Sequence, residues 1–284
     1  MTRARGPRRH RRGGRTAASD FHRAVLGSGR GAAEPMPTEL AYLPDFDAAY
    51  RRRFSARVVG RPPGAIVLDR TYFYPTGGGQ PSDWGWMRVP AGEAVRITEV
   101  RRDGAVVVHR YRGAPEVARG FVPGTEIEGE IDWDRRYAHM RLHSGQHLLS
   151  GLIFARTGRR TLKAALDATR ATIELDAPLS ASEAPALQEE LDRVIREDRP
   201  LRIRSVPREE WERGRTGRAQ GLALAPGIDP VRLIEIEGLD SGPCGGTHVR
   251  STAEIASAVV GPGSPSGDRW ALSLAQPSPS TRPG

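Results

Sequence analysis

Residues 141–150 have the sequence RLHSGQHLLS, in which His143 and His147 stand four positions apart. Leucines flank the histidines and no proline interrupts the run, so the stretch is expected to form an α-helix. A helix turns once every ~3.6 residues, which places positions i and i+4 on one face. The two imidazoles therefore point the same way and can reach a single ion.

A second stretch, CGGTH at residues 244–248, repeats the four-residue interval with a thiol and an imidazole. The two glycines between them permit a tight turn. Two histidines, one cysteine and a further histidine form the nitrogen and sulfur donor set that zinc prefers in tetrahedral geometry. We interpret the two stretches as one zinc site formed by His143, His147, Cys244 and His248. In this site His248 is either a tight ligand, or it stands back and leaves its position open to water or substrate.

Simpler explanations exist for each half of this site. Histidines at helical spacing are common on polar helix faces, and an isolated cysteine is often a small buried hydrophobe. Cys244, however, lies among proline, glycine and threonine, which is a loop composition. The coincidence of both spacings favours the metal site. His139, one turn before His143, lies on the same face and could support the site, but we favour a structural role for it because zinc takes four ligands.

A third motif lies upstream, at residues 73–85, with the sequence FYPTGGGQPSDWG. The glycine triplet at 77–79 lets the backbone approach a ligand or a neighbouring domain closely, although a glycine triplet alone is usually a plain turn. Together, HSGQHLLSG, CGGTHV and this glycine-rich segment resemble the motifs of the alanyl-tRNA editing family. That family comprises the editing domain of alanyl-tRNA synthetase, the related domain of threonyl-tRNA synthetase and the free-standing AlaX proteins. The resemblance covers roughly residues 40–274.

The resemblance implies a fold and an activity. The fold would be α+β, with a small β-barrel domain followed by a zinc-binding editing domain that resembles the second additional domain of threonyl- and alanyl-tRNA synthetases. The activity would be a zinc-dependent deacylase that hydrolyses the ester joining a wrong amino acid, chiefly serine and sometimes glycine, to alanine tRNA. A hydroxyl can be recognised by hydrogen bonds that alanine cannot make. Candidates for binding the amino acid lie in the glycine-rich segment: Thr76, Gly78, Gly79 and Gln80.

Basic residues gather around the expected zinc helix, where they could follow the phosphates of a tRNA acceptor stem. A run of charge is ordinarily a solvated face, and here the neighbouring motif favours RNA contact. The overall net charge of +9 adds little, because nine arginines among residues 1–35 supply most of it. The candidate RNA-binding residues are Arg135, Arg136, Arg141, Arg156, Arg159, Arg160 and Lys163.

Composition divides the chain into four expected segments: a disordered Arg-rich extension (1–36), a β-barrel domain (37–133), the zinc-binding editing domain (134–275) and a disordered tail (276–284). The extension could also bind RNA, or Met36 could be the true start. Short β-like runs between glycine and proline turns, with an alternating pattern at 94–100, predict barrel strands at 54–59, 65–69, 94–100, 105–109 and 127–132. In the second domain, the zinc helix should end near Gly158 and Ser182 should cap the next helix. Residues 213–221 should form a loop. Strands are expected at 169–175, 201–206, 231–236, 253–260 and 270–274.

The 284 residues contain 38% hydrophobic and 27% charged side chains, and no apolar run approaches the ~20 residues of a membrane helix. The single cysteine excludes an internal disulfide. We therefore expect a cytoplasmic protein without membrane contact. We also expect a monomer, because the chain ends soon after the last predicted strand.

Two other functions remain open at this point. The first is an RNA-binding module with a structural zinc and no activity, which an assay of ester hydrolysis would separate from the deacylase. The second is a different metallohydrolase built on the histidine pair. It is disfavoured because the glutamate of an HExxH motif is absent: Ser144 follows His143.

Overall fold

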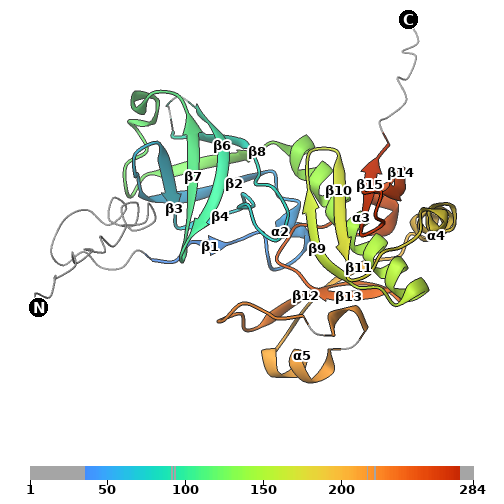
Figure 1. Ribbon diagram of the computed structural model, residues 1–284. Coiled ribbons are helices and arrows are strands. Elements are labelled where there is room, and N and C mark those ends of the chain that lie inside the picture. Colours follow the sequence, from blue (N-terminus) through green and yellow to red (C-terminus); the bar gives the residue numbers. More distant parts are fainter. Residues whose placement is uncertain (1–35, 91, 93, 216, 221, 276–284) are drawn as a thin grey trace, which may run out of the picture.

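The computed structural model describes residues 36–90, 92, 94–215, 217–220 and 222–275. Apart from Met36, the predicted Arg-rich extension lies outside these residues, as does the predicted tail at 276–284. The described chain mixes helices with largely antiparallel sheets, so the predicted α+β class is confirmed. Figure 1 shows two packed parts joined by the long helix α3 (Trp133–Thr157). No helix within the described residues has both the length and the apolarity needed to cross a membrane.

The first part is a closed barrel of six strands in the order β2–β3–β7–β6–β5–β8. Alternating side chains of β2 and β8 point inward, and Phe54, Val58 and Ile127 belong to its core. A short parallel pair, β1 (Glu39–Leu40) and β4 (Arg70–Thr71), lies beside it, with the one-turn helix α2 (Phe46–Ala49). The barrel strands are β2 (Arg53–Gly60), β3 (Ala65–Leu68), β5 (Gly85–Arg88), β6 (Ala94–Asp103), β7 (Val106–Arg112) and β8 (Glu126–Ile131).

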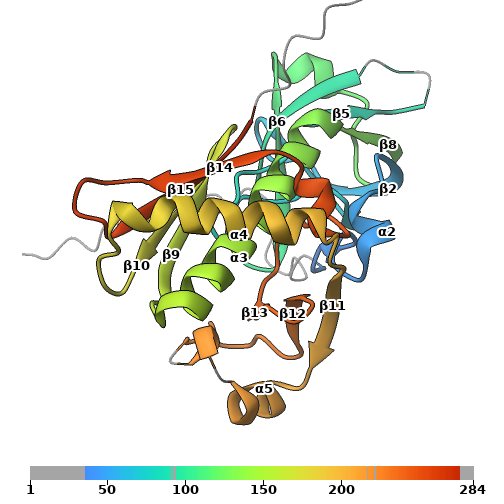
Figure 2. The ribbon, with the colours of Figure 1, turned by 90° about the vertical axis from the view of Figure 1, so that its right-hand side faces the viewer.

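The second part is built around α3, which packs with α4 (Ala184–Arg196) against one face of a four-stranded antiparallel sheet (Figure 2). The order of this sheet is β14–β15–β10–β9, and apolar residues of both helices and of the sheet form one core cluster. Gly158 ends α3 in the left-handed conformation, with φ 71°, as the sequence predicts. The strands are β9 (Thr161–Leu166), β10 (Arg170–Leu175), β14 (Ala258–Pro262) and β15 (Arg269–Leu274).

A separate three-stranded sheet leads the chain into the cysteine loop. It has the antiparallel order β11–β12–β13, and its last strand ends directly before Cys244. Between β11 and β12 the chain forms helix α5 (Arg208–Gly214) and the 3-10 turn η3 (Gly217–Ala219). The strands are β11 (Leu201–Val206), β12 (Val231–Ile236) and β13 (Asp240–Pro243).

Several local predictions were wrong. Ser182 does not cap α4: Ser180 caps a preceding 3-10 turn, η2 (Ala181–Glu183), and α4 begins after Glu183. The strand expected at 253–260 begins only at Ala258, because the 3-10 turn η4 (Thr252–Ile255) comes first and Ala256 adopts a left-handed φ of 57° that interrupts extended backbone. The loop expected at 213–221 contains the end of α5 and the turn η3.

A buried ion pair fastens the barrel to α3. Arg136, in the first turns of α3, bonds to the carboxylate of Asp83, which follows the glycine-rich loop, and both side chains are fully buried. The guanidinium also donates to the carbonyl of Ala49 at 2.7 Å and to that of Tyr72. Asp83 accepts in turn from the backbone N–H of Tyr74 at 2.6 Å. A buried charge needs such complete pairing, so this contact fixes the glycine-rich segment relative to the helix.

Replacement of Arg136 by methionine should lower the free energy of unfolding by roughly 3–5 kcal/mol, because it leaves the buried Asp83 carboxylate without its partner. Urea denaturation measures the loss. Arg53→Met is the matched control: it removes an arginine from a solvent-exposed pair with Glu130 and should cost less than about 1 kcal/mol. Equal losses in the two variants would contradict the role given to the buried pair.

Candidate metal centre

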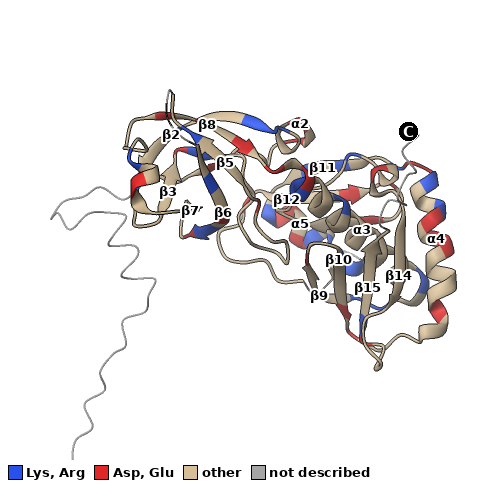
Figure 3. Ribbon diagram, turned by 90° about the horizontal axis from the view of Figure 1, so that it is seen from above, with Lys and Arg blue, Asp and Glu red and all other residues tan. Residues whose placement is uncertain are grey.

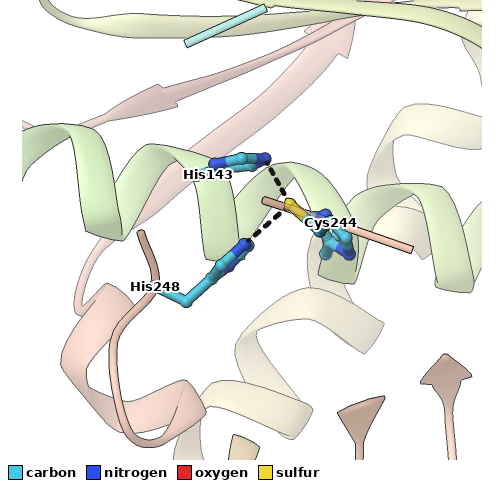
Figure 4. Close-up of side chains that lie close together, drawn as sticks. His143, Cys244 and His248 are labelled. Atoms are coloured by element: carbon cyan, nitrogen blue, oxygen red, sulfur yellow. Dashed lines mark hydrogen bonds between the residues drawn. The ribbon is translucent and has the colours of Figure 1, made fainter. Parts of the chain in front are cut away.

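Four donor side chains converge where α3 meets the loop after β13. His143 and His147 come from consecutive turns of α3, whereas Cys244 and His248 come from the loop. Their ligand atoms all lie within 4.8 Å of one another. The sulfur of Cys244 is 3.5 Å from Nε2 of His143 and 3.2 Å from Nε2 of His248 (Figure 4). The structure thus brings together the four side chains that the sequence suggests as ligands.

The spacing of these atoms fits a shared zinc ion. Zinc binds thiolate sulfur at about 2.3 Å and imidazole nitrogen at about 2.0 Å, which at a tetrahedral angle separates the two donors by about 3.5 Å. The observed sulfur–nitrogen distances of 3.5 and 3.2 Å are close to that value. The donor chemistry and the geometry therefore both suit zinc.

Gln80 orients the first histidine. Its Oε1 accepts a hydrogen bond from the backbone N–H of Thr247 at 3.2 Å, which fixes the carboxamide oxygen on this side. Nδ1 of His143 lies 2.8 Å from the same oxygen and must therefore donate. The remaining ring nitrogen, Nε2, then keeps its lone pair free toward the cluster. Since Gln80 Nε2 also donates to Thr247 Oγ1, one carboxamide ties the glycine-rich segment to both halves of the site.

The other two histidines have comparable outer partners. Nδ1 of His248 lies 3.1 Å from Oγ of Ser144, the residue after His143. Nδ1 of His147 lies 3.4 Å from Oδ2 of Asp240, which is a charge contact and not a hydrogen bond. Arg218 donates to Oδ1 of the same carboxylate at 2.7 Å. Partners of this kind orient imidazoles that bind metals and set their tautomer.

Burial and charge favour the protonation states that bind metal. Desolvation lowers the pKa of His143 to about 3 and lowers the pKa of His248 well below its usual value, so both rings are neutral at pH 7. Burial raises the pKa of the Cys244 thiol, but hydrogen bonding to His147, the N–H of Gly246 and the charge of Arg232 outweigh it and lower the pKa overall. Neutral imidazoles and a thiolate are the forms that coordinate zinc.

Sequence reasoning missed four residues of the centre: Ser144, Arg218, Arg232 and Asp240. Arg232, on β12, donates to the carbonyls of Cys244 at 2.6 Å and Gly246 at 3.2 Å and so shapes the cysteine loop. The sequence carried a weak signal for two of the four, because Ser144 adjoins a predicted ligand and Asp240 precedes Cys244 by four positions. Nothing local marks the two arginines.

The glycine-rich segment lies beside the centre, but its candidate residues differ in what they do. Gln80 is buried and its carboxamide is engaged as described. Thr76 is exposed, and its Oγ1 accepts from the N–H of Ser82 at 3.1 Å. Gly78 and Gly79 both have left-handed φ angles, of 54° and 82°. A Cβ added at Gly79 would lie 2.3 Å from the carbonyl oxygen of Ala164, so this glycine allows the loop to dock on the edge strand β9.

The candidate RNA-binding residues are scattered among different environments. Arg136 has no exposed surface, so the prediction that it contacts RNA is wrong: its charge is used inside the protein by Asp83. The guanidinium of Arg141 donates to the carbonyl of Ile255, that of Arg159 to the carbonyl of Pro178, and Arg160 pairs with Asp176. Arg156 pairs with Glu183 and Glu190, Lys163 is exposed on β9, and Arg135 stacks on Trp84.

Gly246→Ala should abolish stoichiometric zinc binding, because the added Cβ would lie 2.2 Å from Cε1 of His143 and displace the ring. Gly245→Ala is the control, since a Cβ at that position meets nothing within 4 Å. Elemental analysis after dialysis measures the zinc content of both variants. Full zinc content in Gly246→Ala would contradict the arrangement of the site.

Asp240→Asn should weaken zinc binding by roughly 10- to 100-fold, because His147 loses the carboxylate behind its ring. Competition with a chromophoric chelator gives the affinity. Glu235→Gln removes a carboxylate from the adjacent strand β12, where Glu235 pairs with Arg204 rather than with a ligand, and should leave the affinity unchanged. Equal affinities in wild type and Asp240→Asn would show that Asp240 does not support His147.

Comparison with known proteins identifies the family. Residues 47–135 match the family model of class II (A) tRNA synthetases, and residues 231–268 match that of the threonyl and alanyl tRNA synthetase second additional domain. The alanine–tRNA ligase of Pyrococcus abyssi is 36% identical over 221 residues, which cover 76% of this chain and 23% of the ligase. The chain thus spans about a quarter of the length of the ligases that it matches.

Two shorter relatives match over nearly their full length. The alanyl-tRNA editing protein AlaX-M of Methanosarcina acetivorans is 35% identical over 225 residues, which cover 77% of this chain and 90% of that protein. AlaX-M of Methanosarcina barkeri is 34% identical over 223 residues, with 90% of that protein covered. The chain belongs to the family of alanyl-tRNA editing proteins that includes AlaX-M.

Proposed function

We propose that this protein is a trans-editing deacylase that hydrolyses mischarged alanine tRNA, chiefly the serine ester and also the glycine ester. The observation that carries the proposal is the cluster of three buried imidazoles and one half-buried thiol at the junction of α3, the cysteine loop and the glycine-rich segment. It is supported by relatives named as alanyl-tRNA editing proteins, which this chain matches over 90% of their length.

His143, His147, Cys244 and His248 would hold a zinc ion. When bound, zinc supplies positive charge that polarises an ester carbonyl and makes a nearby water molecule more acidic. The chain's own contribution is to hold the donors in place before substrate arrives. Gln80 and Ser144 hold the rings of His143 and His248 through hydrogen bonds, and the carboxylate of Asp240 faces the ring of His147, so little reorganisation is needed during the reaction.

The ester itself requires positioning more than activation. An aminoacyl ester is already reactive, so correct placement beside the centre contributes much of the rate. Burial of the three histidines, each at most 5% exposed, keeps bulk water away from the donors. A low-dielectric site of this kind strengthens the interactions of the residues with a developing charge on the carbonyl oxygen.

Thr76 is our candidate for recognising the serine hydroxyl. Its Oγ1 accepts from Ser82, which leaves the hydroxyl proton free to donate to a substrate oxygen. Gln80 is a weaker candidate than the sequence suggests, because His143 and Thr247 occupy its oxygen and Thr247 one of its N–H groups. Alanine cannot form this hydrogen bond with Thr76, which would favour binding of the serine ester.

A second function is favoured by one observation: four protein donors lie close enough to fill a tetrahedral zinc completely. A closed site of that kind is structural, and the protein would then be an RNA-binding module without activity. Hydrolysis assays separate the two functions.

The purified, zinc-loaded protein should release serine from alanine tRNA and leave the alanine ester intact, as measured with radiolabelled amino acid. His147→Ala should reduce the rate by at least about 10-fold, since loss of a ligand should cost no less than loss of an outer partner. Thr76→Val should reduce the preference for serine over alanine, whereas Leu162→Ala, at an exposed site on β9, should not. If the protein binds zinc and tRNA but hydrolyses neither the serine, the glycine nor the alanine ester, the result would support an RNA-binding module with a structural zinc.

A further inference from the structure

Two tryptophans lie exposed on one outer face of the barrel. Trp84 is 39% and Trp86 44% exposed, whereas Trp211 and Trp270 are buried. Side chains alternate along β5, so Trp86 and Arg88 point outward while Gly85 and Met87 face the core. Large aromatic side chains that are exposed together in one place on a protein surface commonly mark a binding site.

Arginines surround both rings. The guanidinium of Arg135 lies 4.1 Å from the centre of the Trp84 ring, and that of Arg96 lies 5.1 Å from the centre of the Trp86 ring. Beside Trp86 a groove of about 760 Å³ runs over β2, β5 and β8. Figure 3 shows basic positions in blue on strands of the barrel. Three arginines line the groove with Trp86: Arg51, Arg53 and Arg88.

The charge of this surface is positive despite nearby carboxylates. We call it the tryptophan face and define it as Trp84 and Trp86 with five arginines and three acidic residues. Glu130 pairs with Arg53 at 3.1 Å and Asp132 with Arg96 at 2.8 Å, which leaves arginine in excess. Besides the tryptophans, the face consists of Arg51, Arg53, Arg88, Arg96, Arg135, Glu128, Glu130 and Asp132.

The tryptophan face lies close to the metal centre along two segments of the chain. Arg135 precedes His143 by eight residues on α3, a rise of about 12 Å along the helix axis. Trp84 follows Gln80 by four residues in the glycine-rich segment, and the Gln80 carboxamide contacts His143. An RNA strand that has its terminal ester at the centre and follows these two segments would place its preceding nucleotides near this face.

We propose that the tryptophan face binds unpaired nucleotides of the tRNA 3′ end, with bases stacked on the indole and guanidinium planes and phosphates held by Arg51 and Arg88. Base stacking on aromatic and arginine planes requires single-stranded RNA, because a duplex hides the faces of its bases. Arginine beside an exposed ring adds both a second stacking plane and a charge for the backbone. This inference rests on the proposed function, which supplies the tRNA.

Binding of uncharged alanine tRNA tests the proposal directly. Fluorescence anisotropy of labelled tRNA at fixed salt should give a dissociation constant about 5- to 100-fold higher for Trp86→Ala than for wild type. Trp86→Phe should recover most of the affinity, because it keeps an aromatic plane. Removal of the single-stranded 3′ nucleotides from the tRNA should weaken wild-type binding and abolish the difference between wild type and Trp86→Ala.

Charge is tested by a matched pair of variants. Arg88→Ala should weaken binding and reduce the slope of affinity against salt by about one, as expected for one lost phosphate contact. Arg202→Ala removes an exposed arginine from β11, which is not part of the tryptophan face. This variant should change neither the affinity for tRNA nor its dependence on salt. Thermal melting confirms that each variant is folded, and Trp84→Phe and Trp84→Ala repeat the comparison at the second ring.

Hydrolysis assays separate failure of this inference from failure of the proposed function. For the serine ester, Trp86→Ala should raise KM while kcat stays near the wild-type value. The proposal would be overturned if the wild-type protein hydrolyses the ester while Trp84→Ala and Trp86→Ala bind tRNA as tightly as wild type. The tryptophan face would then be a candidate surface for a protein partner. Weakened tRNA binding in these variants supports the proposal even if the wild-type protein hydrolyses no ester. Absence of hydrolysis would contradict only the proposed deacylase activity.

Discussion

The carboxamide of Gln80 is the contact on which the arrangement of the site depends. It joins three segments that are far apart in the chain: the glycine-rich segment of the barrel, helix α3 through His143, and the cysteine loop through Thr247. Because the backbone N–H of Thr247 can only donate, the orientation of the carboxamide is fixed, and with it the tautomer of His143. A site assembled this way exists only when the barrel and the second part of the molecule are packed together.

The buried pair of Arg136 and Asp83 provides the rigidity that this contact needs. Asp83 follows Gln80 by three residues and Arg136 precedes His143 by two helical turns, so the ion pair and the carboxamide hold the same two segments at neighbouring points. Isolated burial of either charge would be unfavourable, whereas the complete set of partners makes the pair a fixed joint. The glycines at 79 and 246 complete the fit, since a side chain at either position would overlap a neighbour.

Local patterns in the sequence predict those features that depend on local physics. Helical spacing places His143 and His147 on one face, and the glycine at 158 ends the helix where a left-handed residue is needed. Short apolar runs predict five of the six barrel strands, and they miss β5, which begins at the last residue of the segment interpreted as a glycine-rich motif. The support of His147 by Asp240 and Arg218 could not be predicted, because it requires a three-stranded sheet to bring β13 against α3. Arg136 shows the same limit in reverse: it belongs to a basic run that is typical of solvated surfaces, yet its partners bury it completely.

The central claim is our proposal that His143, His147, Cys244 and His248 form a site for one zinc ion. X-ray absorption at the zinc edge of the loaded protein tests it most directly. We expect one sulfur at about 2.3 Å and a shell of nitrogen at about 2.0 Å, with the outer scattering of imidazole rings. In Cys244→Ser the sulfur contribution should disappear. A wild-type spectrum fitted by oxygen and nitrogen alone, without sulfur, would contradict the account.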